Sequence, residues 1–481
     1  MTYTRVLPLL TLALLILVTG CDSTDFDPPG ILTTDIEAEG PRGTTVDIPL
    51  NLEADAGIQS LSVSVDGAAA EAVQVQAGSE EQTVTYAFDV PGDAILGTQY
   101  ALAFTLTDEE GGTSMTTATV TTSKVIDTPS TYVFTRDGQS TVSYDGQNDR
   151  LDHLEVIKNY LKTADGGAAI SAQVLMDMFE NTGDNGAGNF SFTSDRRLSN
   201  KTFEPDVEFY EDQFVQAALA SEAGANGVVA ENGRAGLIER ASGSTILVDE
   251  NGREFTQIIE KGLMGAVFYN QIFNVYLADG RIGNDVENTA LSEGKNYTAM
   301  EHHWDEAFGY FNPPIDFTSP WPAERRSEDR FWSNYSTTVD NVDGNGNLGT
   351  NALLMNAYLE GRAAIVNNDL DTKDAQRALL YEYHELVTAA TAVHYINDTL
   401  AALDAGEIGE AFHVLSEAWA FVNAIRYNPG RALTLDQIEQ IMETDFGADG
   451  NFWNVTPAGL NAAKATLVAA YPVMAPVQDD L

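Results

Sequence analysis

The spacing of apolar residues changes from period two to a helical period partway along the chain. From about Leu32 to Thr122, apolar residues alternate with polar ones, and Asp, Gly and Pro separate the runs. The clearest runs are Leu61-x-Val63-x-Val65, Val84-x-Tyr86-x-Phe88-x-Val90 and Leu102-x-Phe104-x-Leu106. Alternation of this kind is typical of half-buried strands joined by short turns. We therefore expect residues 32–122 to form a small all-β sandwich of about six or seven strands.

After a linker at residues 123–131 the period becomes helical. The run Gly262–Leu277 is apolar nearly all round, which predicts a helix buried in the centre of a domain. Helical spacing also covers Leu151–Leu161, Val174–Phe179, Leu353–Val366, Lys373–Leu403, Gly409–Tyr427 and Leu435–Met442. Thr434 and the acidic residues after it form a cap region for the last of these helices. Residues 132–481 are therefore expected to form a large, mainly α-helical domain, either one bundle or a duplicated pair.

The N-terminus has the pattern of an export signal. One positive charge, Arg5, precedes an apolar run from Val6 to Val18 that is too short to span a bilayer comfortably. The ending Val18-Thr19-Gly20-Cys21 resembles a bacterial lipobox, and Cys21 is the chain's one cysteine. We expect a signal peptide at residues 1–20, a lipidated Cys21, and a flexible stalk over residues 21–31. The alternative is an ordinary secretory signal with an incidental cysteine.

Lipidation implies that the exported protein is tethered to the outer membrane, on its surface or its periplasmic side. It also leaves no cysteine for disulfides, metal thiolates or nucleophilic catalysis. The stretch Thr105-Leu-Thr-Asp-Glu-Glu-Gly-Gly resembles the hairpin near the end of bacterial immunoglobulin-like modules. An immunoglobulin-like sandwich without histidines suits a spacer that holds the helical domain away from the membrane.

The chain is strongly acidic. Asp and Glu number 72 against 25 Lys and Arg, which gives a formal net charge of −47. Such a field repels nucleic acid, so we expect no nucleic-acid partner. The hydrophobic content of 43% is ordinary, so the acidity does not indicate disorder. An acidic surface on a normal core is typical of a halophilic, salt-adapted protein. A cation-binding surface is the alternative.

The densest cluster of metal-ligand residue types lies in Glu301-His302-His303-Trp304-Asp305-Glu306. On a helix, His303 and Glu306 are three residues apart and His302 and Glu306 are four apart, so each pair shares a face. An imidazole and a carboxylate that converge in this way can bind zinc or iron. His303 and Glu306 are the expected primary ligands, with His302, Asp305 and Glu301 as alternates or supporting residues. The competing interpretation is that these residues form hydrogen bonds within a core.

Four further residues are candidates to complete such a site from facing helices. Glu410-x-x-His413 has the spacing used in di-iron bundles, although no second Glu-x-x-His occurs. His384 and His394 lie on the long helix expected between the two clusters. For a lone histidine, a structural role in a core is the ordinary alternative.

The His303-x-x-Glu306 pair resembles the signature of imelysin-like lipoproteins, a His-x-x-Glu on a helix of a helical-bundle domain. Three stretches carry a closer resemblance to an imelysin-related group: Tyr132-x-Phe134 with Tyr144-x-Gly146-Gln147-x-x-Arg150-Leu151, then Gly262–Ala266, then His303–Tyr310. Two features depart from the family pattern, because Glu301-His302 replaces the glycine that often precedes the histidine, and the β-domain is an addition. The resemblance implies an imelysin-like helical domain, association with iron acquisition, and a former classification as metallopeptidases.

Together these features predict a tethered lipoprotein that binds a metal or a metal-linked ligand, with iron as the expected metal. One competing function is a metallopeptidase, although two ligands on one helix do not make a catalytic zinc site. Another is a non-enzymatic protein that binds glycans or proteins. The aromatic-rich stretch Phe308–Trp332, which contains Phe311, Trp321, Phe331 and Trp332, is the candidate surface for a glycan, although packing is the commoner role of such residues.

Overall fold

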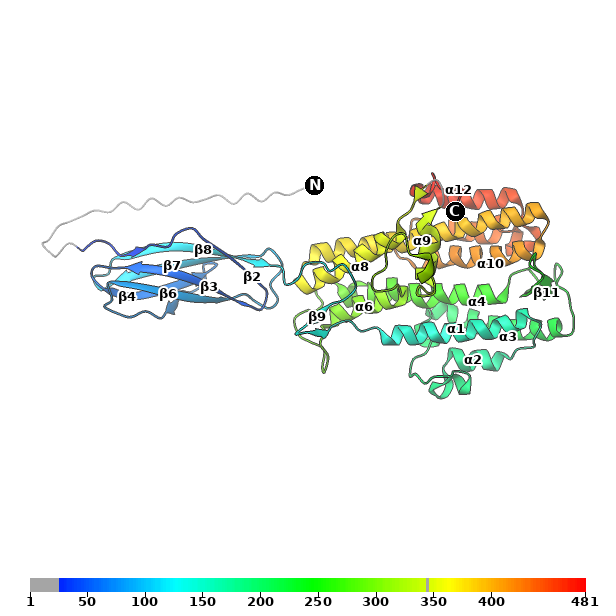
Figure 1. Cartoon of the computed structure of the whole chain (residues 1–481), viewed down its shortest axis with the longest axis horizontal. Coiled ribbons are helices and arrows are strands. Elements are labelled where there is room, and N and C mark those ends of the chain that lie inside the picture. Colours follow the sequence, from blue (N-terminus) through cyan, green and yellow to red (C-terminus); the bar gives the residue numbers. More distant parts are fainter. Residues whose placement is uncertain (1–25, 343–345) are drawn as a thin grey trace. The chain divides into compact units, whose positions relative to one another are not determined.

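The computed structural model describes residues 26–342 and 346–481. The expected signal peptide and Cys21 therefore lie outside the described residues. The chain divides into two compact units (Figure 1). The first extends to Pro91 and includes Gly97–Ser123, and the second comprises Gly92–Leu96 and Lys124–Leu481. Within the described ranges, no helix is both long enough and apolar enough to cross a membrane.

The first unit consists of β-strands. A three-stranded sheet has the order β1-β3-β6, and a five-stranded sheet has the order β2-β8-β7-β4-β5. All neighbours are antiparallel except β2 and β8, which run parallel from Ile36↔Ala118 to Pro41↔Ser123. The strands are β1 (Gly30–Ile31), β2 (Ile36–Pro41), β3 (Thr45–Glu53), β4 (Ile58–Val65), β5 (Glu71–Val73), β6 (Glu81–Asp89), β7 (Gln99–Asp108) and β8 (Thr113–Ser123).

Alternating side chains explain why these strands pair as two sheets with a shared core. In β3, Val46, Ile48, Leu50 and Leu52 are buried, and every residue between them is exposed. Because successive side chains in a strand point to opposite faces, one face of each sheet is apolar and packs inward. The expected β-rich N-terminal region is confirmed. β1 covers the end of the segment that was expected to be a stalk.

The second unit is mainly helical, as expected. Its helices are α1 (Asp145–Asp165), α2 (Ala172–Phe179), α3 (Val207–Ala225), α4 (Phe255–Leu263), α5 (Asp279–Ile282), α6 (Ala299–Phe311), α7 (Trp332–Asp340), α8 (Thr350–Asn367), α9 (Leu370–Ala405), α10 (Ile408–Ala424), α11 (Leu435–Gln440) and α12 (Pro457–Ala470). Short strands form three antiparallel pairs: β9 (Thr135–Arg136) with β10 (Gln139–Ser140), β11 (Gly236–Glu239) with β12 (Thr245–Val248), and β13 (Asn341–Val342) with β14 (Gly346–Asn347). The sequence pattern had not indicated α3, α12 or the β11–β12 hairpin.

A buried helical segment runs through the middle of this unit. It begins as α4 and continues through two π-helical segments, η5 (Met264–Tyr269) and η6 (Ile272–Tyr276). α4 packs against α1 and α10, and α9 packs against α8, α10 and α12 (Figure 1). Nearly every residue from Phe255 to Phe273 is buried, which confirms the helix that the all-round apolar run predicts. Its wide apolar surface requires neighbours on every side.

The remaining helical and turn segments are short. Single 3-10 turns lie at η1 (Thr182–Asp184), η2 (Gly186–Gly188), η3 (Ser199–Lys201), η4 (Glu204–Asp206), η7 (Ala323–Arg325), η8 (Ile425–Tyr427), η10 (Ala448–Gly450), η11 (Phe452–Asn454) and η12 (Pro472–Met474), and η9 (Ile441–Asp445) is π-helical. Thr434 caps α11 as expected, because its hydroxyl accepts from Gln437 N and the Gln437 side chain accepts from Thr434 N.

Candidate functional site

Helix α6 carries the densest sequence cluster, and a capping box sets where it starts. The Thr298 hydroxyl accepts from Glu301 N, and the Glu301 carboxylate accepts from Thr298 N at 2.8 Å. α6 begins at Ala299, so the whole cluster lies on the helix. Its residues divide between two faces of that helix. Glu301 and Asp305 lie on one face. His302, His303 and Glu306 lie on the other.

Glu301 and Asp305 belong to a buried ion-pair network. Arg362 of α8 is fully buried, with its Nε 2.8 Å from Asp305 Oδ1 and its Nη1 3.3 Å from Glu301 Oε1. Arg136 also pairs with Glu301 at 2.9 Å, and the Tyr132 hydroxyl donates to Asp305 at 2.9 Å. Burial raises the pKa of Asp305 to about 6, although Arg362 and Tyr132 oppose this shift. The contacts of these two acids thus join α6 to α8.

His302, His303 and Glu306 lie together on the other face of α6. Glu306 Oε2 is 3.0 Å from His303 Nδ1, Glu306 Oε1 is 3.8 Å from His302 Nε2, and the Gln147 amide donates to Glu306 at 3.1 Å. The His302 ring stacks on Tyr297, with centroids 4.6 Å apart. The structure therefore brings the His303-x-x-Glu306 pair and His302 into one cluster.

His302 and Glu306 of this cluster form part of the wall of a pocket of about 410 Å³, which we call the basic pocket. It is lined by Ser143, Tyr144, Asp145, Gly146, Gln147, Arg150, Arg196, Lys201, Tyr276, Lys295, Tyr297, His302 and Glu306. These residues come from the start of α1, from the loops before α3 and α6, from η6 and from α6 itself. Sequence-distant segments therefore meet here, and the volume suits a small ligand.

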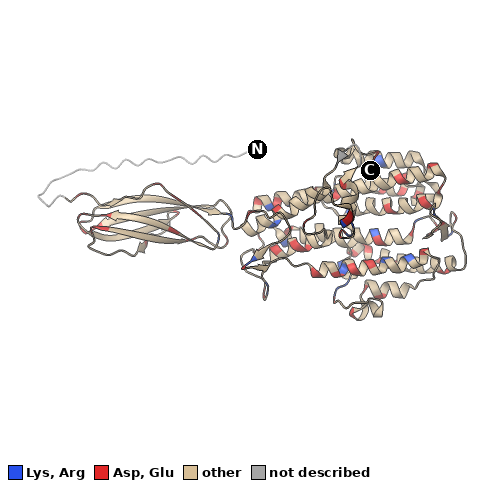
Figure 2. Cartoon of the chain, viewed as in Figure 1, with Lys and Arg blue, Asp and Glu red and all other residues tan. Residues whose placement is uncertain are grey.

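Four cationic side chains line the basic pocket, although the chain is strongly acidic (Figure 2). Arg150 is buried, and its guanidinium donates to the carbonyls of Arg197 at 2.8 Å and Gly146 at 2.9 Å. Lys201 Nζ lies 3.4 Å from the Tyr276 hydroxyl. Among the described residues, neither side chain forms an ion pair with a carboxylate within 4.0 Å. The positive charges of Arg150 and Lys201 are therefore not neutralised by ion pairs with carboxylates of the described residues.

The pKa shifts of groups at the pocket agree with this excess of positive charge. Burial and the Arg150 guanidinium lower the pKa of Lys201, and Glu306 only partly offsets them. Burial also lowers the pKa of His302, with His303 and Lys295 acting in the same direction. Burial alone would raise the pKa of Glu306, but the hydrogen bond from His303 and the charges of both histidines lower it. Glu306 is therefore held as a carboxylate among donors.

Two predicted ligands on α9 lie in other surroundings. His384 is fully buried among aromatic rings, its Nε2 is 2.9 Å from the Tyr358 hydroxyl, and burial lowers its pKa to about 3. The His394 side chain is 30% exposed, and its Nε2 lies 3.5 Å from Asp398, one turn along the same helix. Neither residue lines the basic pocket.

The other two predicted ligands, on α10, also have partners elsewhere. Arg240 of the loop after β11 pairs with Glu410 at 2.6 Å. His413 Nδ1 is 2.6 Å from Glu254, and its Nε2 is 3.6 Å from Glu417. Glu410 and His413 are three residues apart on α10, but each contacts a different partner.

The donor set does not form a cage for a bare metal ion. Within residues 26–342 and 346–481, no three or more His, Cys, Asp or Glu side chains are arranged so that they could hold a metal ion. In the basic pocket, Glu306 is engaged by His303 and Gln147, and cationic side chains line the same walls. A site of this composition suits an anion better than a free cation.

The sequence pattern had not marked the cationic residues of this pocket. Arg150 lies in one of the stretches that carry the imelysin resemblance, but nothing assigned it a role. Arg196 and Lys201 lie in the connection between α2 and α3, and Lys295 lies in the loop before α6, so no periodic spacing connects the four cations. The one available signal was the scarcity of basic residues, which makes any spatial group of four of them unusual.

Residues 129–473 match a family described as a domain of unknown function, DUF4856. The comparison with curated proteins found no match to the chain. The matched range covers well over half of the chain and contains α1, α6 and every residue that lines the basic pocket. The chain therefore belongs to the DUF4856 family.

Proposed function

We propose that this chain is an exported, lipid-anchored binding protein that captures a small anionic iron chelate in the basic pocket. The observation that carries the proposal is Arg150, a buried guanidinium on the wall of the pocket that has no carboxylate partner among the described residues. A buried charge of this kind is costly unless a counter-charge reaches it. A ligand carboxylate or phosphate would supply that counter-charge and accept its hydrogen bonds.

The metal enters this proposal as cargo that the ligand holds with its own donors. Iron is chosen because the helical domain resembles imelysin-like lipoproteins, which are associated with iron acquisition. Two of the stretches that carry this resemblance, Tyr144–Leu151 and His303–Tyr310, meet at the pocket. His302 and Glu306 would then contact the edge of the chelate, with His303 holding Glu306 in place, and the four cations would bind its anionic groups.

The proposal also includes the architecture and the address of the protein. The order of the two sheets and the parallel pairing of β2 with β8 favour an immunoglobulin-like module for the first unit. The helical unit would be an imelysin-like domain. Acylation of Cys21 would tether both units to the outer membrane, and the β-module would act as the spacer.

The test is a calorimetric titration of the full chain, purified without a His-tag in mild detergent, with three probes: ferric citrate, citrate alone and zinc chloride. We expect ferric citrate to bind with one-to-one stoichiometry. Arg150→Gln should weaken it by about tenfold to a hundredfold, since a hydrogen bond to a charged group contributes about 1.5–3 kcal/mol. Arg234→Gln is the matched control, because Arg234 is half-exposed in the turn before β11 and does not line the pocket.

The three probes separate the competing functions. Equal affinity for citrate and ferric citrate would indicate that the ligand is a free organic anion and not an iron chelate. Tight binding of zinc that is lost in both His303→Ala and Glu306→Ala, with no binding of citrate, would overturn the anion proposal in favour of a bare-metal site. Weak binding of every probe that all variants share would leave this pocket without a ligand role.

A further inference from the structure

Two arginines of the basic pocket meet at one glycine. Arg150 Nη1 donates to the carbonyl of Gly146 at 2.9 Å. A Cβ atom at Gly146 would lie 2.9 Å from Arg196 Nε, so the Arg196 side chain crosses the space that any other residue would need there. Arg150 Nε also donates to the Arg197 carbonyl at 2.8 Å, which ties α1 to the segment that carries Arg196. Both guanidinium groups therefore lie beside Gly146, on one wall of the pocket.

The two arginines are held in different ways. Arg150 is buried, and the acceptors of its hydrogen bonds are backbone carbonyls. The Arg196 side chain is 46% exposed, and it forms an ion pair with its neighbour in sequence, Asp195, whose side chain is 77% exposed. A pair this open to solvent holds its members only weakly. Arg150 is thus a fixed positive charge, whereas the Arg196 side chain can turn towards a ligand.

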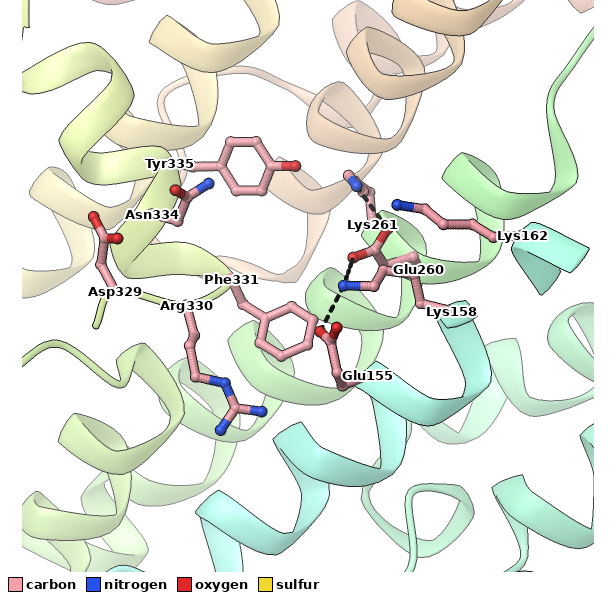
Figure 3. Close-up of a pocket in the computed structure, with 10 residues that line it drawn as sticks. All are labelled: Glu155, Lys158, Lys162, Glu260, Lys261, Asp329, Arg330, Phe331, Asn334 and Tyr335. Carbon is pink, nitrogen blue, oxygen red and sulfur yellow. Dashed lines mark hydrogen bonds and ion pairs between the residues drawn. The ribbon is translucent and has the colours of Figure 1, made fainter. Parts of the chain in front are cut away.

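The charges of a second pocket are arranged differently. This pocket, of about 290 Å³, is lined by residues of α1, α4 and α7 and of the loop before α7 (Figure 3). The dashed lines in Figure 3 join Lys158 to Glu155 at 2.6 Å and to Glu260 at 3.8 Å, and Lys261 to Glu260 at 2.7 Å. Glu260 is a buried acid that serves both lysines. Among the described residues, neither arginine of the basic pocket has a buried carboxylate within 4.0 Å, so the second pocket needs no external anion and the basic pocket does.

A loop that is closed by one asparagine carries Arg196 to the pocket. Asn181 follows α2, is 1% exposed and has φ 49°, a left-handed conformation that asparagine tolerates better than most residues. Its amide nitrogen donates to the carbonyls of Ser194 and Arg196, each at 2.6 Å, and its amide oxygen accepts from Gly186 N at 2.9 Å. One side chain thus joins the start of the loop to its end and fixes where the Arg196 backbone lies.

The same loop is attached to α1 at two further points. Ser194 Oγ donates to Asp149 Oδ2 at 2.7 Å, and the Phe190 ring stacks on His153 with centroids 4.5 Å apart. Because α1 also carries the other arginine, the backbones that present the two guanidinium groups are fixed relative to each other. The one freedom that remains at this wall is the exposed side chain of the loop arginine.

Building on the proposed function, we propose that Arg196 is the specificity-determining residue of the basic pocket and selects ligands with two separate anionic groups. One carboxylate would bind Arg150 in the pocket wall, and Arg196 would turn onto a second one, because its planar fork suits a carboxylate. Asn181 and Gly146 are its positioning residues, since the first places the backbone and the second leaves room for the side chain. A ligand with one anionic group would neutralise Arg150 and leave Arg196 in solvent.

The first experiment tests the number of anionic groups. Calorimetry on the full chain in mild detergent compares citrate, free and as its ferric chelate, with dimethyl citrate, which keeps one carboxylate. We expect Arg196→Gln to weaken both forms of citrate by about tenfold, the lower end of the range for a charged hydrogen bond, because the site is partly exposed. Dimethyl citrate should bind the variant and the unmodified chain alike. A citrate affinity that Arg196→Gln leaves unchanged, or a dimethyl ester that binds as tightly as citrate, would overturn the proposal.

Two substitutions outside the guanidinium test how it is positioned. Gly146→Ala and Asn181→Asp should each weaken citrate about as much as Arg196→Gln, and neither should weaken it further in the Arg196→Gln background. Gly146→Ala should keep its unfolding temperature, because the group that it displaces is the end of a flexible side chain. Asn189→Asp is the matched control, since Asn189 donates to the Gly186 carbonyl within the same loop. Additive losses would mean that the substitutions act on the ligand directly, and would overturn the positioning role.

The same titrations distinguish the need for two anionic groups from the choice of iron. Equal binding of citrate with and without iron, together with a loss in Arg196→Gln, would support the two-anion requirement and contradict the iron chelate. Weakening by Arg150→Gln but not by Arg196→Gln would leave the iron chelate in place and overturn the role of Arg196. No binding of citrate in either form would overturn both.

Discussion

Arg362 Nε lies 2.8 Å from Asp305 Oδ1, and both side chains are completely buried. The same guanidinium reaches Glu301, so one base on α8 is shared by two acids one turn apart on α6. Two acids of the Glu301–Glu306 cluster, Glu301 and Asp305, therefore have a structural role. Their contact with α8 also directs His302, His303 and Glu306 to the opposite face, where the basic pocket lies.

Removal of Arg362 should strongly destabilise the helical unit. Arg362→Met leaves Asp305 and Glu301 buried with fewer partners, which typically costs about 3–5 kcal/mol in the free energy of unfolding. Urea unfolding followed by circular dichroism measures the change. Arg234→Ala breaks an exposed pair with Glu231, and we expect about 0–1 kcal/mol from it. Equal midpoints for Arg362→Met and the unmodified chain would show that the buried pair adds no stability.

Gly361 of α8 is the position where that helix approaches Trp304 of α6. A Cβ atom at Gly361 would overlap the six-membered part of the Trp304 ring, which is fully buried. Gly361→Ala should therefore destabilise the unit by about 1–3 kcal/mol, although alanine is the better helix former. Gly280→Ala is the matched control, because a Cβ there meets nothing within 4 Å. Thermal unfolding that ranks both variants alike would contradict this packing.

His153 should make the protein less stable in mild acid. The ring is buried and stacks on Phe190 with centroids 4.5 Å apart, and burial lowers its pKa from 6.5 to about 4. Below pH 6.5 the unfolded chain binds a proton that the folded chain does not, so stability falls as pH drops from about 6.5 to about 4. The full loss is about 3 kcal/mol, since one pKa unit corresponds to 1.36 kcal/mol.

The variant His153→Phe removes the titrating imidazole but keeps an aromatic ring in the stack. Its stability should fall less steeply than that of the unmodified chain between about pH 6.5 and 4, and the two curves should run parallel above pH 7. Urea unfolding at a series of pH values tests both parts. Identical slopes over the acid range would mean that His153 does not titrate differently in the two states.

Ligand affinity at the basic pocket should depend on salt. An anion held by Arg150, Arg196, Lys201 and Lys295 loses attraction as counter-ions screen the charges, and the screening length falls from about 8 Å at 0.15 M to about 3 Å at 1 M. We expect the affinity for ferric citrate to fall by about threefold to tenfold over that range. Calorimetry with ferric citrate at 0.15 M and 1 M salt measures the change. An affinity that stays the same between the two would contradict the role of the four cations.

The fold class was predictable because burial imposes a local period on each kind of element. Val46, Ile48, Leu50 and Leu52 alternate with exposed residues in β3, as a half-buried strand requires. Gly262–Leu277 is apolar all round, as a helix with neighbours on every side requires. α3 and α12 were missed, and exposed apolar residues such as Leu219 contribute to the weak amphipathic pattern of α3.

The site was predictable only in part. The spacing in α6 correctly placed His302, His303 and Glu306 on one face, because residues three and four apart in a helix are neighbours. The same rule could not show that Glu301 and Asp305 face Arg362, since that contact depends on how α8 packs against α6. Nor could it show the separate partners of His384, His394, Glu410 and His413.

The sequence by itself determined the succession of a β-rich region and a mainly helical region, the charge of the whole chain, and the neighbours within each helix. These properties depend on local periodicity and on composition, which need no knowledge of contacts. Only the tertiary structure brought Arg150, Arg196, Lys201 and Lys295 together with the His303–Glu306 pair. Those cations lie on a helix and in loops far apart in the chain, and a charge cluster of that kind exists only once the segments pack around a common pocket.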